Sequence, residues 1–576
     1  MKISARYQIV LATLGLNACT LKDSSQAAKG GGPAADMTKG AAESAGSDTF
    51  PTSTEGLPEA KPMQVVELAD GESYTLTASP VKQKIGGQWV RRLAYNGSVP
   101  GPVLKVKQGA TVRVTLKNLT DVPTSLHPHG LRLDYRYDGV VGVGQMKPVA
   151  PGESYDYVLK FPDAGIFWYH PHIREDYSQG LGMYGNFWVT PKDPQFWNPV
   201  HQEVAVLLDD ATVKDAAPFY RDRVTHTLMG RYGEQTLING QDDFKLNTKV
   251  GEVVRLYLTN TANTRTIKFS LPGARMKLVG SDGGLFERET WVDSVIVAPS
   301  ERYQVEVRYD TPGTYDILNN KPGQPVRIGK VVVAAGQAAP LAHDFNQLRS
   351  PGPAVTDLGK VKLKLDGKVD KFLTISLLMK PDNMGASHQA HGAHHQAAMP
   401  AMDHKMDHKM DHKMDHKIEM DSHGQHSGHG SATKGESAAA EEDRGIEWTD
   451  EMAAMNRAST DKTIVWQLID TQTKATNMDI NWQFKRGAFV KIRIYNDPKS
   501  AHPMQHPIHF HGQRFVVATV NGKRNRNLVW KDSALVRPGD TVDIVLEASN
   551  PGSWMAHCHI SEHLHAGMMM GFNVSE

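Results

Sequence analysis

Three segments of the chain share one alternation of apolar and polar positions. In each, a glycine is followed by three apolar residues at alternate positions and then by an asparagine; the segments are residues 109–118, 251–260 and 487–496. Apolar side chains with a period of two are typical of a strand that buries one face in an antiparallel sheet. We therefore predict three related strands, spread over nearly the whole chain.

A second pattern accompanies each of these strands. It reads as a strand, a turn with glycine and another strand, at residues 161–170, 310–318 and 550–557. Two patterns that recur in the same order indicate an internal repeat. The prediction is an all-β chain of three consecutive β-sandwich domains, at residues 61–195, 196–350 and 351–576.

The repeats differ in their candidate metal ligands. Five positions after the turn glycine lie His170 in the first repeat and His557 in the third, but Leu318 in the second. Where the first repeat has a His-Pro-His sequence at 127–129, the second has no ligand at 266–269. The second domain is therefore predicted to be a spacer without metal. The first and third domains must face each other if their histidines share one cluster, which would then lie at a domain interface.

Composition gives no support for nucleic-acid binding or for a membrane-spanning helix. Hydrophobic residues make up 40% of the chain, enough for sizeable cores, and the formal net charge of +1 gives no electrostatic reason to expect nucleic-acid binding. No apolar run reaches the 18 residues of a membrane-spanning helix.

The N-terminal residues predict export. Lys2 and Arg6 precede a short apolar stretch at 9–16, as in a signal peptide, and the residues up to Cys19 resemble a bacterial lipoprotein signal. On this reading residues 1–18 are removed, lipid on Cys19 is the only membrane anchor, and residues 19–60 form a flexible tether. The protein would be on the periplasmic side of a membrane, and Thr20 in place of Asp favours the outer membrane. The alternative is an ordinary cleaved signal with an incidental cysteine.

Histidines recur in four short clusters outside any low-complexity segment. Three of them lie at 127–129, 170–172 and 506–511, and the fourth, at 557–563, surrounds Cys558, one of only two cysteines. A thiolate, imidazoles and a downstream methionine, Met568, are together the ligand types typical of a copper site. In a strand, His557 and His559 would point to one face and Cys558 to the other. This tripeptide therefore predicts two metal sites joined as an electron relay.

With these four clusters and three repeats, residues 60–576 resemble the multicopper oxidases, the family of laccases and bacterial copper-efflux oxidases. The resemblance implies cupredoxin-like Greek-key sandwiches and four coppers: one type 1, one type 2 and two type 3. The type 1, or blue, copper accepts single electrons from a reductant, and the other three reduce dioxygen to water.

The resemblance also implies a ligand for each copper. The blue copper would take His506, Cys558 and His563, with Met568 as a weak axial ligand that implies a lower potential than Leu or Phe would. The type 2 copper would take His127 and His509. The type 3 coppers would take His129, His170 and His559 on one ion and His172, His511 and His557 on the other.

Reduction of dioxygen consumes protons, so a carboxylate near the cluster is expected as a relay. By resemblance, Asp138 is the candidate; the alternative is a solvated loop aspartate. Glu562, beside His563, is a second candidate, either as a relay or as a group that orients the ligand. A further acid of some relatives is Leu564 here, so their proton route is not fully present.

A low-complexity segment rich in His and Met, which we call the His/Met tract, interrupts the third domain at 384–444, after a predicted strand at 371–379. It holds four Met-Asp-His-Lys tetrads and eleven of the 26 histidines. Few branched apolar residues are present, so we expect disorder. Thioether and imidazole groups bind copper, and copper-resistance oxidases carry a Met-rich insertion here. We expect a sleeve that binds extra copper and delivers it to, or shields, the blue copper; the alternative is a solvating insert without function.

Three functions are compatible with these features. The first is oxidation of Cu(I) to Cu(II) by dioxygen in copper tolerance, which the His/Met tract favours. The second is laccase-like oxidation of phenols and aromatic amines. The third is a non-catalytic copper-sequestering lipoprotein, against which the complete ligand set argues.

Overall fold

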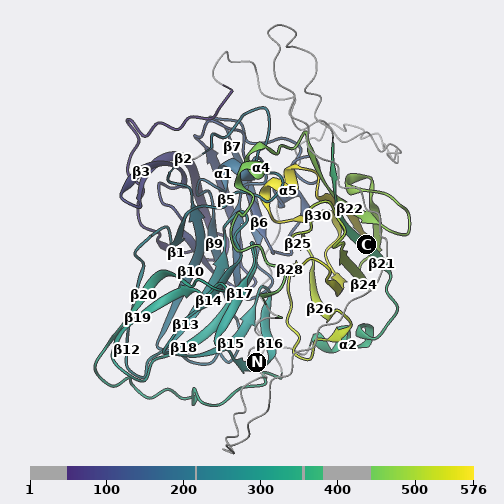
Figure 1. Ribbon diagram of the computed structural model, residues 1–576. Helices are drawn as coiled ribbons and strands as arrows, with labels where there is room; N and C mark the ends of the chain where they lie inside the picture. Colours follow the sequence, from purple (N-terminus) through teal and green to yellow (C-terminus); the bar gives the residue numbers. More distant parts are fainter. Residues whose placement is uncertain (1–47, 215–216, 353–356, 381–440, 442) are drawn as a thin grey trace, which may run out of the picture. The chain divides into compact units, whose positions relative to one another are not determined.

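The computed structural model describes residues 48–214, 217–352, 357–380, 441 and 443–576. The predicted signal peptide, Cys19 and residues 384–440 of the His/Met tract lie outside these residues. Three pairs of sheets follow one another along the chain, seen in Figure 1 as purple to blue, teal, and green to yellow strands. Within the described ranges, no helix has the length and apolar character needed to span a bilayer.

The first sandwich contains a four-stranded and a five-stranded sheet. The four-stranded sheet has the order β3 (Gln88–Tyr95), β2 (Ser73–Ile85), β5 (Thr111–Asn118), β7 (Ser154–Lys160). The five-stranded sheet has the order β1 (Val65–Glu67), β4 (Val103–Lys107), β9 (Gly185–Thr190), β8 (Gly165–His170), β6 (His127–His129). The short helices η1 (Tyr135–Tyr137) and α1 (Glu175–Ser178) follow β6 and β8.

The second sandwich contains a six-stranded and a five-stranded sheet. The six-stranded sheet has the order β11 (Gln235–Ile238), β10 (Gln202–Ala211), β13 (Val253–Asn260), β18 (Arg302–Arg308), β15 (Arg275–Ser281), β16 (Gly284–Trp291). The five-stranded sheet has the order β12 (Lys245–Lys249), β20 (Val326–Ala334), β19 (Gly313–Asn319), β14 (Ile267–Ser270), β17 (Ser294–Val297).

The third sandwich also has six and five strands. The six-stranded sheet has the order β22 (Ile464–Asp470), β21 (Lys371–Met379), β24 (Ala488–Asn496), β29 (Thr541–Ala548), β26 (Arg514–Val520), β27 (Lys523–Arg524). The five-stranded sheet has the order β23 (Asn481–Lys485), β31 (Met569–Ser575), β30 (Gly552–Cys558), β25 (His506–Phe510), β28 (Ser533–Val536). Its helices are α2 (Leu358–Leu365), α4 (Ala453–Ala458), η3 (Asn477–Asp479) and α5 (Ser561–His565).

The predicted repeats occupy equivalent places in the three sandwiches. The glycine-to-asparagine segments form β5, β13 and β24, each paired in parallel with one strand and antiparallel with another. The turn-containing segments end in β8, β19 and β30. The prediction of an all-β chain of three successive sandwiches is therefore confirmed.

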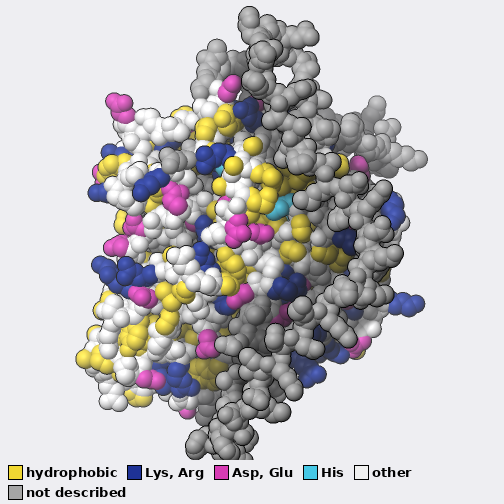
Figure 2. All heavy atoms as spheres, viewed as in Figure 1, with side chains coloured by type: hydrophobic (Ala, Val, Ile, Leu, Met, Phe, Trp, Pro, Cys, Tyr) yellow, Lys and Arg dark blue, Asp and Glu magenta, His cyan; other side chains and the backbone are white. Residues whose placement is uncertain are grey.

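Each sandwich has its own apolar core, and a further cluster joins the first two. In that cluster Trp168 and Trp188 of the first sandwich pack with Leu207 and Tyr257 of the second. On the face shown in Figure 2, acidic and basic side chains are interspersed, in keeping with the balanced formal charge.

Two expected flexible segments contain packed residues at their ends. In the expected tether, Phe50 is buried, its ring stacks on Tyr177 at 3.9 Å, and its backbone N–H donates to the Phe219 carbonyl. The tether prediction is therefore wrong for the segment around Phe50, because its aromatic side chain packs against the apolar ring of Tyr177. At the end of the His/Met tract, Asp443 lies 2.8 Å from Lys268 Nζ and Arg444 lies 2.6 Å from Asp540.

Candidate metal centre

The first sandwich places four histidines at one end of its five-stranded sheet. Strands β6 and β8 are antiparallel, and His127 lies opposite His170 in their register. His129 ends β6, and His172 follows β8 by two residues. All four side chains are buried. The His-Pro-His sequences therefore bring imidazoles from two neighbouring strands to one edge.

The third sandwich repeats this arrangement on β25 and β30. In their register His509 lies opposite His557, and Ile508 lies opposite Cys558. Because side chains alternate along a strand, Cys558 points away from the face that carries His557. Cys558 lies with His506 and His563, whereas His557 lies with His172 and His511. Cys558 and His557 therefore lie in two different groups of side chains that could hold a metal ion, in keeping with the alternation expected of a strand.

Histidines of the first and third sandwiches meet face to face. The rings of His127 and His511 stack with centroids 4.1 Å apart, and those of His129 and His509 with centroids 3.7 Å apart. The His559 ring lies 5.0 Å from the His129 and His170 rings. We call the whole set the eight-histidine cluster: His127, His129, His170, His172, His509, His511, His557 and His559.

The ring nitrogens of this cluster fit metal ions. Five of them are buried and have no hydrogen-bond partner: His127 Nε2, His129 Nδ1, His170 Nε2, His509 Nε2 and His559 Nε2. The other three rings direct Nε2 atoms at one another, with His557 Nε2 2.9 Å from His511 Nε2 and 3.4 Å from His172 Nε2. Buried polar atoms rarely stay without partners, so these nitrogens point to ligation.

The opposite ring nitrogens are held by the protein. The Nδ1 atoms of His127, His170 and His557 lie 2.7–2.8 Å from backbone carbonyl oxygens. Bonds of this kind fix the tautomer and the ring orientation of a metal ligand. Burial lowers the pKa of His511 to about 3. Burial also lowers the pKa of six other histidines of the cluster, which are His129, His170, His172, His509, His557 and His559. These rings are therefore neutral at pH 7, the form that binds metal.

A second site surrounds Cys558. Its Sγ lies 3.6 Å from His506 Nδ1 and 3.8 Å from His563 Nδ1. Met568 is fully buried in the same apolar core, and its carbonyl accepts a hydrogen bond from the Cys558 N–H. Burial raises the pKa of the Cys558 thiol. A metal ion would replace that proton, since a coordinated thiol is deprotonated. We call His506, Cys558, His563 and Met568 the cysteine site.

Asp138 is not a solvated loop residue. Its side chain is buried, with Oδ2 2.8 Å from His511 Nδ1 and Oδ1 3.4 Å from His127 Nδ1. Burial alone would raise the pKa of this carboxyl, but the His511 and His127 rings hold it far below its usual range. Asp138 thus contacts a histidine from each half of the eight-histidine cluster.

Glu562 is buried but does not orient His563. Both of its carboxylate oxygens lack a hydrogen-bond partner, and its nearest cation is Arg231, with Nε 3.9 Å away. Burial, against the attraction of Arg231, raises the pKa of Glu562 to about 7. The Glu562 carboxylate makes no hydrogen bond to the His563 ring among the described residues. Its role as a proton carrier remains a prediction.

Glu562 should make the copper-free protein less stable as the pH rises. Its folded pKa of about 7 exceeds the ordinary value of 4.5, so the folded protein holds the proton more tightly than the unfolded chain. Between pH 4 and pH 8 the wild type should lose about 3 kcal/mol of unfolding free energy relative to Glu562→Gln. Urea unfolding of both proteins across this range measures the difference. Parallel pH curves for wild type and Glu562→Gln would contradict the assignment, and exposed Glu153→Gln is the control.

Two acids of the site were not predicted from sequence. Glu175 on α1 places Oε1 3.0 Å from His172 Nδ1 and Oε2 2.6 Å from His565 Nε2. Asp532, just before β28, lies with Oδ1 3.1 Å from His129 Nε2. Glu175 lies three residues after His172, a helical spacing that a closer reading of the sequence would have detected. No local signal connects Asp532 to His129, which precedes it by 403 residues.

Comparisons with known proteins agree with this geometry. The family description Multicopper oxidase matches residues 78–194, 202–338 and 449–576, which together cover about two thirds of the chain. The chain is 24% identical to "Multicopper oxidase mco" of Staphylococcus aureus, over 88% of this chain and 89% of that protein. It is 25% identical to "Copper resistance protein A homolog" of Pseudomonas syringae pv. tomato, over 88% of this chain and 93% of that protein.

The fold agrees as well. A multi-copper oxidase crystal structure from Pseudomonas thermotolerans superposes with a TM-score of 0.61 at 24% identity, covering 88% of this chain and 100% of that one. The chain therefore belongs to the multicopper oxidase family and is a copper-dependent oxidoreductase built from cupredoxin-like domains.

Proposed function

We propose that this protein oxidises Cu(I) to Cu(II) in copper tolerance and passes the electrons to dioxygen. Four cuprous ions, one dioxygen and four protons would give four cupric ions and two waters. Copper would supply one-electron transfer at the cysteine site and dioxygen reduction at the eight-histidine cluster, with ions distributed over the ligands as the family resemblance implies. The single observation that carries the proposal is the tripeptide 557–559, which joins the two sites covalently.

The protein shields the cysteine site from water and holds a carboxylate beside the eight-histidine cluster. The side chains of His506, Cys558 and His563 have no exposed surface. The Trp466 ring covers His506 and His563, with centroids 4.6 and 4.5 Å away. Ionised Asp138 accepts the Nδ1 proton of His511, and we assign to it the delivery of protons that dioxygen reduction consumes.

The attachment of the His/Met tract favours Cu(I) as the electron donor. Strands β21 and β22 pair in antiparallel register, with Met379 opposite Ile464, so the chain leaves and returns at one place. Trp466, two residues beyond Ile464, contacts both histidines of the cysteine site. Thioether sulfur favours Cu(I), so a Met-rich tract that begins just beyond Met379, on the strand paired with β22, supports a cuprous donor at the cysteine site. The similarity to a copper resistance protein homolog supports the same substrate.

The test compares Cu(I) and a phenol as donors for two variants of the copper-loaded enzyme. One variant lacks residues 384–440, and the other keeps that length with every Met and His of the tract replaced by Ser. Both stop before Asp443 and Arg444, which pair with Lys268 and Asp540. Oxygen uptake with Cu(I) should fall about 10-fold or more in both, since both lose the soft ligands. Uptake with 2,6-dimethoxyphenol should rise only in the deletion, which removes the steric cover.

The wild type provides the control for both arms. Unchanged Cu(I) rates in both variants would contradict a role of the tract in cuprous oxidation. A wild type that consumes oxygen with the phenol but not with Cu(I) would identify a laccase-like enzyme instead. A wild type inactive with both donors would favour copper sequestration.

A further inference from the structure

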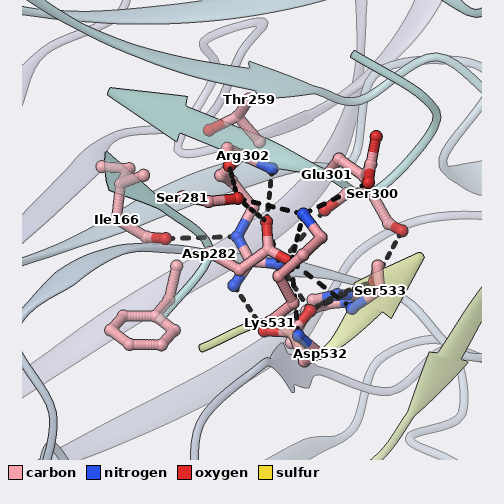
Figure 3. A network of polar contacts seen from close by, with 12 residues as sticks. Ile166, Thr259, Ser281, Asp282, Ser300, Glu301, Arg302, Lys531, Asp532 and Ser533 are labelled. Carbon is pink, nitrogen blue, oxygen red and sulfur yellow. Dashed lines mark hydrogen bonds and ion pairs between the residues drawn. The ribbon is translucent and has the colours of Figure 1, made fainter. Parts of the chain in front are cut away.

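A buried polar network joins all three sandwiches (Figure 3). It also contacts the eight-histidine cluster. Its centre is Arg302, the first residue of β18 in the second sandwich. The Arg302 guanidinium donates to Asp532 through Nη1 at 2.6 Å and Nη2 at 2.5 Å, and through Nε to the Ile166 carbonyl at 3.2 Å. Asp532 belongs to the third sandwich and Ile166 to the first. A single side chain of the second sandwich therefore holds the other two.

Asp532 in turn contacts two histidines of the cluster. Its Oδ1 accepts from His129 Nε2 at 3.1 Å, and its backbone carbonyl accepts from His509 Nδ1 at 2.8 Å. These bonds leave His129 Nδ1 and His509 Nε2 as the nitrogens without a partner. The choice of metal-binding nitrogen on both rings thus depends on where Asp532 is held.

A second layer of charges keeps Arg302 and Asp532 in place. The Arg302 backbone N–H donates to Asp282 Oδ1 at 2.8 Å, and Lys531 Nζ lies 3.2 Å from both Asp282 Oδ2 and Glu301 Oε1. All five side chains are buried. Breaking a buried ion pair leaves an uncompensated charge and is strongly unfavourable, so the network has one preferred arrangement.

We propose that the second sandwich is part of the dioxygen-reducing site, with Arg302 as a positioning residue that orients the His129 and His509 rings through Asp532. The inference rests on the proposed function, because it takes these histidines as copper ligands. The second sandwich, predicted from the sequence to be a spacer without metal, would then have a role in the metal centre. Among the described residues, none of the groups that could hold a metal ion includes a residue of the second sandwich. Its contribution is instead an ion pair that sets the geometry of ligands supplied by its neighbours.

The test compares Arg302→Gln with a matched buried pair in the same sheet. Arg255 on β13 is also buried, and its Nη2 donates to Glu306 at 2.6 Å within the second sandwich. Both variants break a buried arginine–carboxylate pair, but only Arg302→Gln disturbs a contact to the histidines. Copper content after dialysis against a chelator, the type 2 copper EPR signal and the blue absorption band are measured for each.

We expect Arg302→Gln to keep the blue band but to bind type 2 copper 10–100-fold more weakly, as for other groups that orient metal ligands. Arg255→Gln should keep all four coppers and an unchanged type 2 signal. If Arg302→Gln fails to fold, Arg302→Lys, which retains one charge-assisted bond to Asp532, should show the same loss to a smaller degree.

Three outcomes would overturn the inference. The first is an unchanged type 2 EPR signal and full copper in the Arg302 variant that folds. The second is an equal copper loss in Arg255→Gln, which would mean that the second sandwich acts only through its stability. The third is a wild type with fewer than four coppers, which would overturn the proposed function together with the inference and is seen before any variant is made.

Discussion

Cys558→Ser is expected to abolish both the blue absorption band and the oxidation of any donor. Serine has nearly the same size but offers a hydroxyl where the site needs a soft thiolate between His506 and His563. The backbone pairing of β30 with β25 does not involve the sulfur, so the eight-histidine cluster should stay intact. Absorption spectroscopy, oxygen uptake and copper analysis check this, with three coppers expected in place of four.

The matched control for this variant is Met568→Leu. Leucine keeps the apolar packing of Met568 and removes only the weak axial ligand, so the blue band should remain and the potential should rise. A Cys558→Ser protein that stays blue, or that still consumes oxygen with Cu(I), would show that electrons enter elsewhere. Loss of all four coppers in Cys558→Ser would show that the two sites do not load independently.

His557→Ala is expected to separate electron entry from dioxygen reduction. The His557 Nε2 atom lies 2.9 Å from His511 Nε2 and 3.4 Å from His172 Nε2, so its loss opens the eight-histidine cluster. The cysteine site, on the other face of the strand, keeps all its ligands. The variant should therefore be blue, be bleached by a donor, and stay bleached in air, whereas the wild type regains its colour.

Oxygen uptake and the recovery of the blue band after one addition of donor measure this effect. His201→Ala is the control, because His201 lies just before β10 in the second sandwich and bonds only backbone groups, the Val253 N–H and the Ala339 carbonyl. Recovery of the blue band in His557→Ala at the wild-type rate would remove His557 from the dioxygen-reducing site.

Much of the fold was predictable because its signals are local. The alternation in residues 109–118, 251–260 and 487–496 depends on which face of each strand is buried, and the strands formed as expected. The division of His557 and Cys558 between two sites also follows from the two-residue period of a strand. The copper-binding residues could therefore be proposed before any tertiary contact was known.

Other features depend on contacts between distant segments. Phe50 was expected in a tether and is buried against Tyr177, because the apolar surface that it covers is made by another part of the chain. Asp532 was not predicted as part of the site, because it lies 403 residues from His129 and meets it only where the sandwiches pack. The contact of Glu175 with His172 is different, because the two residues are only three positions apart and their spacing is a local signal.

The sequence by itself determined the strands, the three repeats and the residues able to bind copper, because periodicity and ligand chemistry are properties of short segments. Only the tertiary structure decided which nitrogen of each ring remains free, which carboxylates face the cluster, and that Arg302 of the second sandwich holds Asp532 against His129. The physical reason is that a buried charge is tolerated only with a partner, and that partner is chosen by how the sandwiches pack.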